Sequence, residues 1–227
     1  MREMKTALLV AALVMGLSSL AEASAVPAVA CSTGTLTLYL ISGYSCTIGS
    51  LTFSDFKYSN AAFGGATAVP AAGISVTPIT GSEEGFQFEA PWSVSSAQGE
   101  DSAITYTVTA DSGTITELIL SMAGFGVTRG GNVSIGETSD TPPLSLLTFD
   151  NLTGVQATDT ITGLSVTSIT LVKDIALAGN NGVATLSIVD NEFSTSTRVP
   201  EPSSILLFGA GLVGVASYLR RRQLSKS

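Results

Sequence analysis

Three carboxylates precede the single tryptophan of this chain, within the stretch 83–92. They are Glu83, Glu84 and Glu89, and the tryptophan is Trp92. An aromatic ring that stacks on a sugar, beside two carboxyl groups acting as acid and base, is the arrangement that glycoside hydrolysis uses. The same residues also fit a core tryptophan with solvated acidic turns beside it. Because sequence does not fix the separation of about 5–10 Å that catalysis requires, we predict a domain that is not an enzyme and keep Trp92 as a candidate glycan contact.

The numbers of histidine and cysteine residues restrict the nucleophilic and zinc chemistry that this chain could perform. The chain contains no histidine and two cysteines, Cys31 and Cys46. Without histidine a Cys–His nucleophile is excluded, and a zinc site would depend on carboxylates. In an exported chain, a close pair of cysteines indicates a disulfide. Closing a loop of about 15 residues stabilises the folded chain by roughly 3 kcal/mol in the chain-entropy description.

Several acidic turns supply the oxygen ligands that calcium takes, six to eight of them in most sites. These turns contain Glu100–Asp101, Asp140 and Asp190–Asn191–Glu192. None has the spacing of a defined calcium loop. We therefore predict no cofactor and solvated acidic turns, with a structural calcium ion as the alternative.

Alternating threonines recur along the chain and raise the question of an ice-binding plane. Such a plane needs flat and regularly repeated ranks, whereas twisted strands place threonine on the solvent face of ordinary sheets. The intervals here are irregular, so we expect solvent-facing strand positions. The ranks are Thr105, Thr107 and Thr109, then Thr114 and Thr116, then Thr158, Thr160 and Thr162.

The elements that position these residues are short strands. The clearest is 104–110, which alternates apolar residues with threonine. Segment 60–73 is rich in alanine and glycine and predicts a loop, and 179–182 predicts a turn. About nine or ten strands predict an all-β fold, an antiparallel β-sandwich for which jelly-roll and immunoglobulin-like orders both stay open. Further strand or apolar segments are 36–41, 46–53, 74–79, 86–89, 115–122, 132–137, 144–149, 164–172 and 183–189.

Charge excludes one class of partner. Between Val26 and Thr197 there are 15 acidic residues and three basic ones, Lys57, Arg129 and Lys173, for a net charge of −12. Nucleic-acid binding depends on lysine and arginine at phosphates. Nucleic acid is therefore not an expected partner, and the acidity suits an extracellular surface.

The first residues have the pattern of an export signal. Arg2 and Lys5 precede the unbroken apolar run 7–17, and Ala21-Glu22-Ala23 forms a small-x-small cleavage site. This order is that of a secretory signal peptide. Cleavage after Ala25 is also allowed, since Ala23-Ser24-Ala25 fits the same rule, and we place the signal peptide at residues 1–25.

The last residues combine a rigid motif, an apolar run and a basic cluster. The two prolines of the motif keep their neighbours extended, so a helix can begin only after them. The run 203–219 reaches the low end of the ~17–25 residues that a membrane helix needs, and arginines after it would hold that end in the cytoplasm. The motif is Val199, Pro200, Glu201 and Pro202, and the stop-transfer cluster is Arg220, Arg221 and Arg222.

In this order the residues resemble the PEP-CTERM sorting signal of Gram-negative bacteria. The resemblance implies a substrate of exosortase, a membrane-embedded processing enzyme that acts at the Pro-Glu-Pro site. The tail is also labelled the C-terminal domain of ice-binding proteins, which says little about the domain before it. A plain membrane anchor is the alternative, and it differs only in that the tail is kept.

We therefore expect a signal peptide at 1–25, a β-sandwich domain at 26–197 and a sorting signal at 198–227, with one transmembrane helix and a basic tail at 220–227. The expected protein is a non-catalytic structural or adhesive protein of the cell envelope or extracellular matrix, anchored in the inner membrane before processing. Its expected partners are exosortase and extracellular polysaccharide. A secreted carbohydrate-binding module is the runner-up, and an enzyme that acts on polysaccharide comes third.

Overall fold

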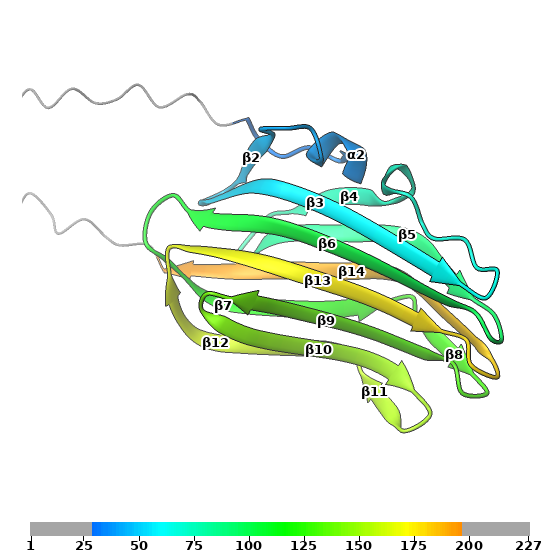
Figure 1. The fold of residues 1–227 in the computed structure, drawn as a ribbon. Coiled ribbons are helices and arrows are strands. Elements are labelled where there is room, and N and C mark those ends of the chain that lie inside the picture. Colours follow the sequence, from blue (N-terminus) through cyan, green and yellow to red (C-terminus); the bar gives the residue numbers. More distant parts are fainter. Residues whose placement is uncertain (1–28, 197–227) are drawn as a thin grey trace, which may run out of the picture.

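Two antiparallel sheets make up the part of the chain that the computed structural model describes, residues 29–196. Each sheet has seven strands, and the two sheets lie face to face as the layers of a sandwich (Figure 1). The predictions of an all-β fold and of two antiparallel sheets are thus confirmed.

The first sheet, called sheet A, has the strand order β11-β10-β9-β13-β6-β3-β2. Its strands, in chain order, are β2 Ser45–Ile48, β3 Leu51–Phe63, β6 Gly99–Ala110, β9 Asn132–Asp140, β10 Pro143–Asn151, β11 Gly154–Gln156 and β13 Ser168–Ala178.

The second sheet, called sheet B, has the order β1-β4-β5-β14-β7-β12, and β8 also pairs with β14. The last described strand, β14, therefore lies in the interior of sheet B, between β5 and β7. The strands of sheet B are β1 Gly34–Thr35, β4 Ser75–Ile79, β5 Glu84–Val94, β7 Thr114–Ala123, β8 Gly126–Thr128, β12 Thr158–Val166 and β14 Val183–Ser196.

The core follows from strand alternation. In β6, the side chains of Ile104, Tyr106 and Val108 point between the sheets and are fully buried, while the threonines between them face outward. The centre of the core is aromatic, because the Tyr106 ring packs against Phe56 at 5.3 Å between ring centroids and against Phe88 at 6.2 Å. The sandwich therefore has a single apolar interior that both sheets share.

Three segments differ from their sequence-based predictions. The predicted loop 60–73 begins later, because β3 continues to Phe63 and pairs with β6 along that length. The predicted strand 164–172 is two strands, since the chain turns at Thr167 between β12 and β13. The apolar run 36–41 contains the short helix α2, Leu36–Tyr39, and a 3₁₀ turn, η1, covers Ala71–Gly73. In α2 a helical turn places Leu36 and Tyr39 on the same side, where both are buried.

The predicted disulfide is confirmed. Cys31 and Cys46 are bonded, with their Cα atoms 4.8 Å apart. The segment between them passes from β1, at the edge of sheet B, through α2 to β2, at the edge of sheet A. The bond therefore holds a connection that closes one side of the sandwich.

The predicted membrane and targeting segments lie outside the described residues. These are the signal peptide at 1–25, the motif at 199–202, the transmembrane helix at 203–219 and the arginines at 220–222. Among residues 29–196, no helix has the length and apolar character needed to cross a bilayer.

Candidate functional site

The outer surface of sheet A is rich in hydroxyl groups. Thr107 on β6 lies opposite Thr170 on β13, and their Oγ1 atoms are 2.9 Å apart. Thr109 and Ser168 form the same kind of pair, also at 2.9 Å. We call this surface the hydroxyl face. It comprises Thr52, Ser54, Thr105, Thr107, Thr109, Thr138, Ser168 and Thr170, all exposed or half-buried.

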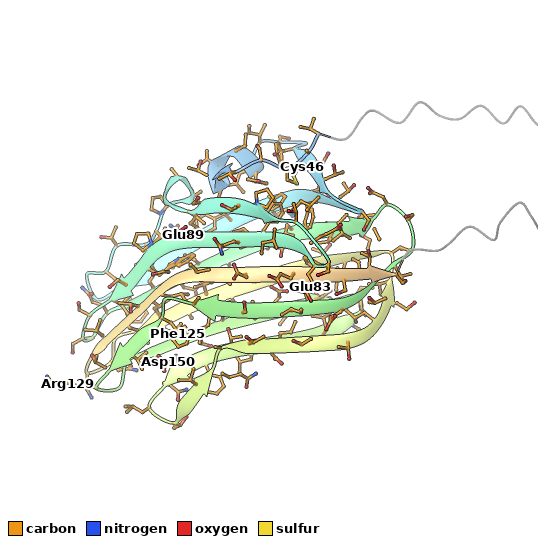
Figure 2. The ribbon with its side chains drawn as sticks, turned by 180° about the vertical axis from the view of Figure 1, so that it is seen from behind. Cys46, Glu83, Glu89, Phe125, Arg129 and Asp150 are labelled. Carbon is orange, nitrogen blue, oxygen red and sulfur yellow. A yellow bond between two sulfur atoms is a disulfide. The ribbon has the colours of Figure 1, made fainter. Side chains whose placement is uncertain are left out.

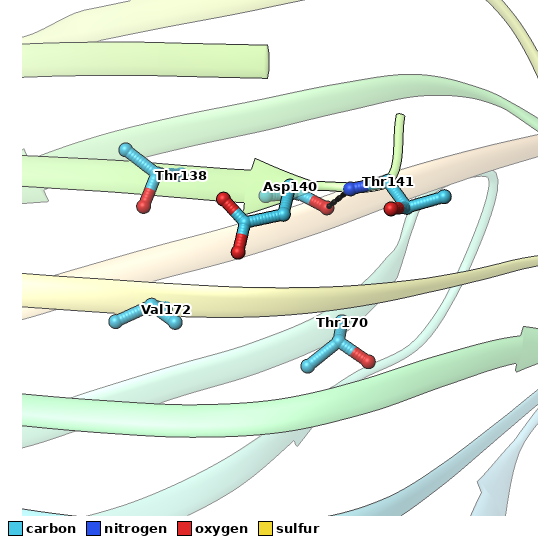
Figure 3. A pocket seen from close by; sticks show the side chains of 6 residues that line it. Thr138, Asp140, Thr141, Thr170 and Val172 are labelled. Carbon is cyan, nitrogen blue, oxygen red and sulfur yellow. Dashed lines mark hydrogen bonds between the residues drawn. The ribbon is translucent and has the colours of Figure 1, made fainter. Parts of the chain in front are cut away.

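A pocket of about 310 Å³ lies at one end of the hydroxyl face, where β9 ends beside β13 (Figure 3). The Thr141 backbone N–H donates to the Ser139 Oγ at 3.3 Å, which shapes the end of β9. Hydroxyl groups and one carboxylate suit a ligand that offers hydroxyls of its own. The lining residues are Thr138, Ser139, Asp140, Thr141, Thr170 and Val172.

The three carboxylates near Trp92 have separate surroundings. Glu84 accepts a hydrogen bond from the Ser50 backbone N–H at 3.0 Å, so it links the β2–β3 turn to the start of β5. Glu83 hydrogen-bonds to the carboxyl group of Glu192 on β14. Glu89 lies further along β5 (Figure 2). It lines a second pocket of about 390 Å³. The structure therefore does not bring these three residues together as one acid–base site.

The Glu83–Glu192 pair is the most perturbed acidic site on the outer side of sheet B. Partial burial, then the hydrogen bond and charge of Glu83, and last the charge of Asp190 raise the pKa of Glu192 to about 7. Two carboxyl groups in hydrogen-bond contact share a proton more readily than they both ionise. Glu192 therefore titrates near neutrality, which the sequence pattern did not indicate.

Trp92 is in the core, and this corrects its assignment as a candidate glycan contact. Its side chain is 1% exposed, and its Nε1–H donates to the Ser102 Oγ at 3.3 Å between the sheets. A ring that solvent does not reach has no face free to stack on a sugar. The alternative interpretation of a core tryptophan describes its position.

The residues proposed as calcium ligands lie apart. Glu100 is buried and accepts a hydrogen bond from the Val69 N–H at 2.5 Å. Asp140 lines the hydroxyl-face pocket, whereas Asp190 and Glu192 lie on β14 in the other sheet. Within residues 29–196, no three histidine, cysteine or acidic side chains are grouped so as to hold a metal ion.

The predicted ranks of threonine lie on different sheets. Thr105, Thr107 and Thr109 belong to β6 in sheet A. The other ranks belong to β7 and β12 in sheet B. They therefore do not form one plane.

A buried polar network lies between the sheets, and sequence reasoning missed it. Lys173 on β13 pairs with Glu137 on β9, and both side chains are 0% exposed. Asn191 on β14 and Tyr106 on β6 complete the network and are equally buried. Strand alternation could have revealed the lysine, because Lys173 follows Leu171 and precedes Ile175 at inward-facing positions of β13.

The structure thus defines an all-β protein whose described part is a sandwich of two antiparallel sheets with a hydroxyl-rich outer face. Residues 198–222, which begin two residues after the end of β14, match the PEP-CTERM protein-sorting motif. The resemblance drawn from the tail sequence is therefore confirmed.

No curated protein matches the chain. Among solved structures, TmCBM61 in complex with beta-1,4-galactotriose is 12% identical, with 63% of this chain and 90% of that chain covered and a TM-score of 0.32.

Proposed function

We propose that this chain is an exported protein of the cell surface or extracellular matrix, with a non-catalytic structural or adhesive β domain. The observation that carries the proposal is the PEP-CTERM motif at 198–222, which begins two residues after Ser196, the end of β14. The disulfide between Cys31 and Cys46 supports an oxidising compartment. Lys57 and Arg129 are the exposed cations of the described residues, so the domain surface is strongly anionic.

In this proposal each terminal segment has one role. The signal peptide at 1–25 directs export, and the apolar segment 203–219 holds the precursor in the inner membrane. Arg220, Arg221 and Arg222 keep the far end in the cytoplasm. Exosortase then processes the chain at the Pro-Glu-Pro site, which contains Glu201. The domain is then released to the envelope or its polysaccharide matrix.

The intact mass of the protein recovered from its host tests this proposal at both ends. We expect a chain that has lost residues 1–25 and a C-terminal segment that includes 203–219. Replacing Glu201 with alanine should leave the tail attached and the protein in the membrane fraction. Thr197→Ala, just before the matched motif, is the control and should be processed normally.

Two results would contradict the proposal. A full-length chain in the cytosol with free thiols at Cys31 and Cys46 would exclude export. A tail that stays attached in the wild type would leave export intact but replace processing with permanent anchoring.

A second candidate function is carbohydrate binding at the hydroxyl-face pocket. The observation that favours it is the convergence of Thr138, Asp140 and Thr170 around about 310 Å³ of open space. Binding to a glycan array should then be lost in Asp140→Ala and weakened in Thr170→Val. Glu89→Ala, in the pocket of sheet B, is the matched control. Loss of binding in that variant alone would move the site to the other sheet, and a wild-type protein that binds no glycan would exclude this candidate.

A further inference from the structure

One buried carboxylate holds two nitrogen atoms from opposite sheets. The Lys173 Nζ donates to the Glu137 Oε2, and the Asn191 Nδ2 donates to the Glu137 Oε1 at 2.9 Å. Lys173 and Glu137 belong to β13 and β9 of sheet A, while Asn191 belongs to β14 of sheet B. The amine and the carboxamide are therefore neighbours across the sandwich, and each contacts the same potential proton carrier.

The oxygen of the carboxamide has a donor of its own. The Tyr106 hydroxyl donates to the Asn191 Oδ1 at 2.8 Å. The Asn191 Nδ2 also donates to the Ile119 carbonyl at 3.3 Å, which fixes the orientation of the amide. The Tyr106 ring lies among Phe53, Phe56, Phe86 and Phe88, so this site is enclosed by apolar rings.

We propose that the Lys173 Nζ and the Asn191 Cγ become joined by an intramolecular amide bond, with release of ammonia. The Lys173 Nζ attacks the Asn191 Cγ, a new C–N bond forms, and the bond between Cγ and Nδ2 breaks. The sheets are then linked covalently through β13 and β14. No oxidant, cofactor or water enters the balance.

Glu137 carries the protons. It first takes one proton from the lysine ammonium, which frees the lone pair of Nζ. It then gives that proton to Nδ2, which leaves as ammonia, and takes the second proton that Nζ must lose to become an amide nitrogen. Glu137 thus ends as a neutral carboxylic acid, in hydrogen-bond contact with the new amide.

The surroundings favour each stage of this reaction. Burial lowers the pKa of Lys173, and the neighbouring Glu137 carboxylate opposes that shift. The Tyr106 hydroxyl stabilises the negative charge that develops on Oδ1, as donors in an oxyanion hole do. The shared Glu137 carboxylate holds the amine and the carboxamide near each other, so no bimolecular encounter is needed. The reaction also exchanges a fully buried ion pair, which is costly to desolvate, for two neutral groups.

The peptide between Arg129 and Arg198 provides the test. The full chain is purified, its disulfide is reduced, and it is digested with trypsin in denaturant. We expect no cleavage after Lys173, and one peptide covering 130–198 whose mass is lower by one ammonia. Fragment ions should place the missing ammonia in a link between Lys173 and Asn191.

Variants separate the chemistry from the fold. Glu137→Gln removes the proton carrier, and trypsin should then cleave after Lys173 and give the fragments 130–173 and 174–198, neither of which has lost ammonia. Glu100→Gln, at another buried glutamate outside this network, should keep the link. Tyr106→Phe retains the ring, and the link should form about 10²-fold or more slowly. If Glu137→Gln does not fold, the wild-type peptide map still decides.

Two results would overturn the proposal. One is complete cleavage of the wild-type protein after Lys173, with unmodified masses on both sides. The other is an ammonia loss that maps to Asn181–Gly182 while Lys173 remains cleavable, because a cyclised asparagine before glycine has the same mass change without a link between the sheets.

Discussion

The protonation of Glu192 is coupled to the stability of the fold. Its carboxyl group lies half-buried on β14 against that of Glu83, and its pKa of about 7 stands above its ordinary value of 4.5. The folded state therefore binds this proton more tightly than the unfolded state does. The resulting stability is fully present below pH 4.5 and is lost as the pH rises through about 7.

We predict that Glu192→Gln raises the melting temperature at about pH 8 and leaves it unchanged at about pH 4, because glutamine cannot ionise against Glu83. Calorimetry at the two pH values measures this difference. Glu89→Gln, at an exposed position of β5, is the control and should change the melting temperature little at either pH. A Glu192→Gln variant that is stabilised equally at both pH values would show that packing, and not ionisation, is responsible.

For single residues, the sequence predicted the disulfide but not which side chains are buried in the core. Cys31 and Cys46 form the expected disulfide. The prediction was possible because the chain has only these two cysteines and they lie close together in the sequence. Trp92 was a candidate ligand contact, although alternation with Ala90 and Val94 on β5 places it inward. The charge count included Lys173 without a location, and its burial depends on Glu137, which comes from a neighbouring strand that is distant in sequence.

The strands β5 and β14 approach each other so closely at position 85 that only glycine fits there. A Cβ atom added to Gly85 would lie 1.8 Å from the Asn191 carbonyl oxygen, which is backbone and cannot turn away. By contrast, a Cβ added to Gly136 on β9 would meet nothing within 4 Å. The two glycines therefore differ in the space around them.

We predict that Gly85→Ala lowers the free energy of unfolding by about 1–3 kcal/mol, the usual range for overpacking. Gly136→Ala is the matched control and should have a small or favourable effect. Alanine gives the unfolded chain fewer conformations than glycine does, so less conformational entropy is lost on folding. Urea denaturation of both variants measures the difference. Equal losses in the two variants would contradict the role assigned to the β5–β14 contact.

Element types were predictable from alternation, and element limits were less so. The threonine strand at 104–110 is part of β6, which begins earlier, at Gly99. Short β1 and β8 carry two and three residues and have no periodic signal of their own. The pocket beside Asp140 depends on the neighbouring positions of β9 and β13, and strand order is not contained in local pattern.

Across the whole molecule, the disulfide closes the side of the sandwich where β1 of sheet B and β2 of sheet A are joined. We predict that reduction lowers the free energy of unfolding by roughly 3 kcal/mol, the value for a loop of about 15 residues. Thermal unfolding with and without a reducing agent measures this loss. A Cys31→Ser/Cys46→Ser double variant should unfold at the lower temperature and no longer respond to the reducing agent. If the unfolding temperature of the wild-type protein does not change with the reducing agent, the packing of α2 stabilises this side of the sandwich without the disulfide.

The place of β14 has a consequence for the order in which the molecule is assembled. In the proposed export the chain would cross a membrane with its N-terminus first, so β5 and β7 would arrive with a one-strand gap between them, and sheet B would remain in two pieces. The gap is filled only when β14, residues 183–196, emerges. The motif at 198–222 follows β14 in the sequence after one residue. Completion of the fold and delivery of the sorting signal are therefore nearly simultaneous, so the cell would process a chain whose last strand has only just been inserted.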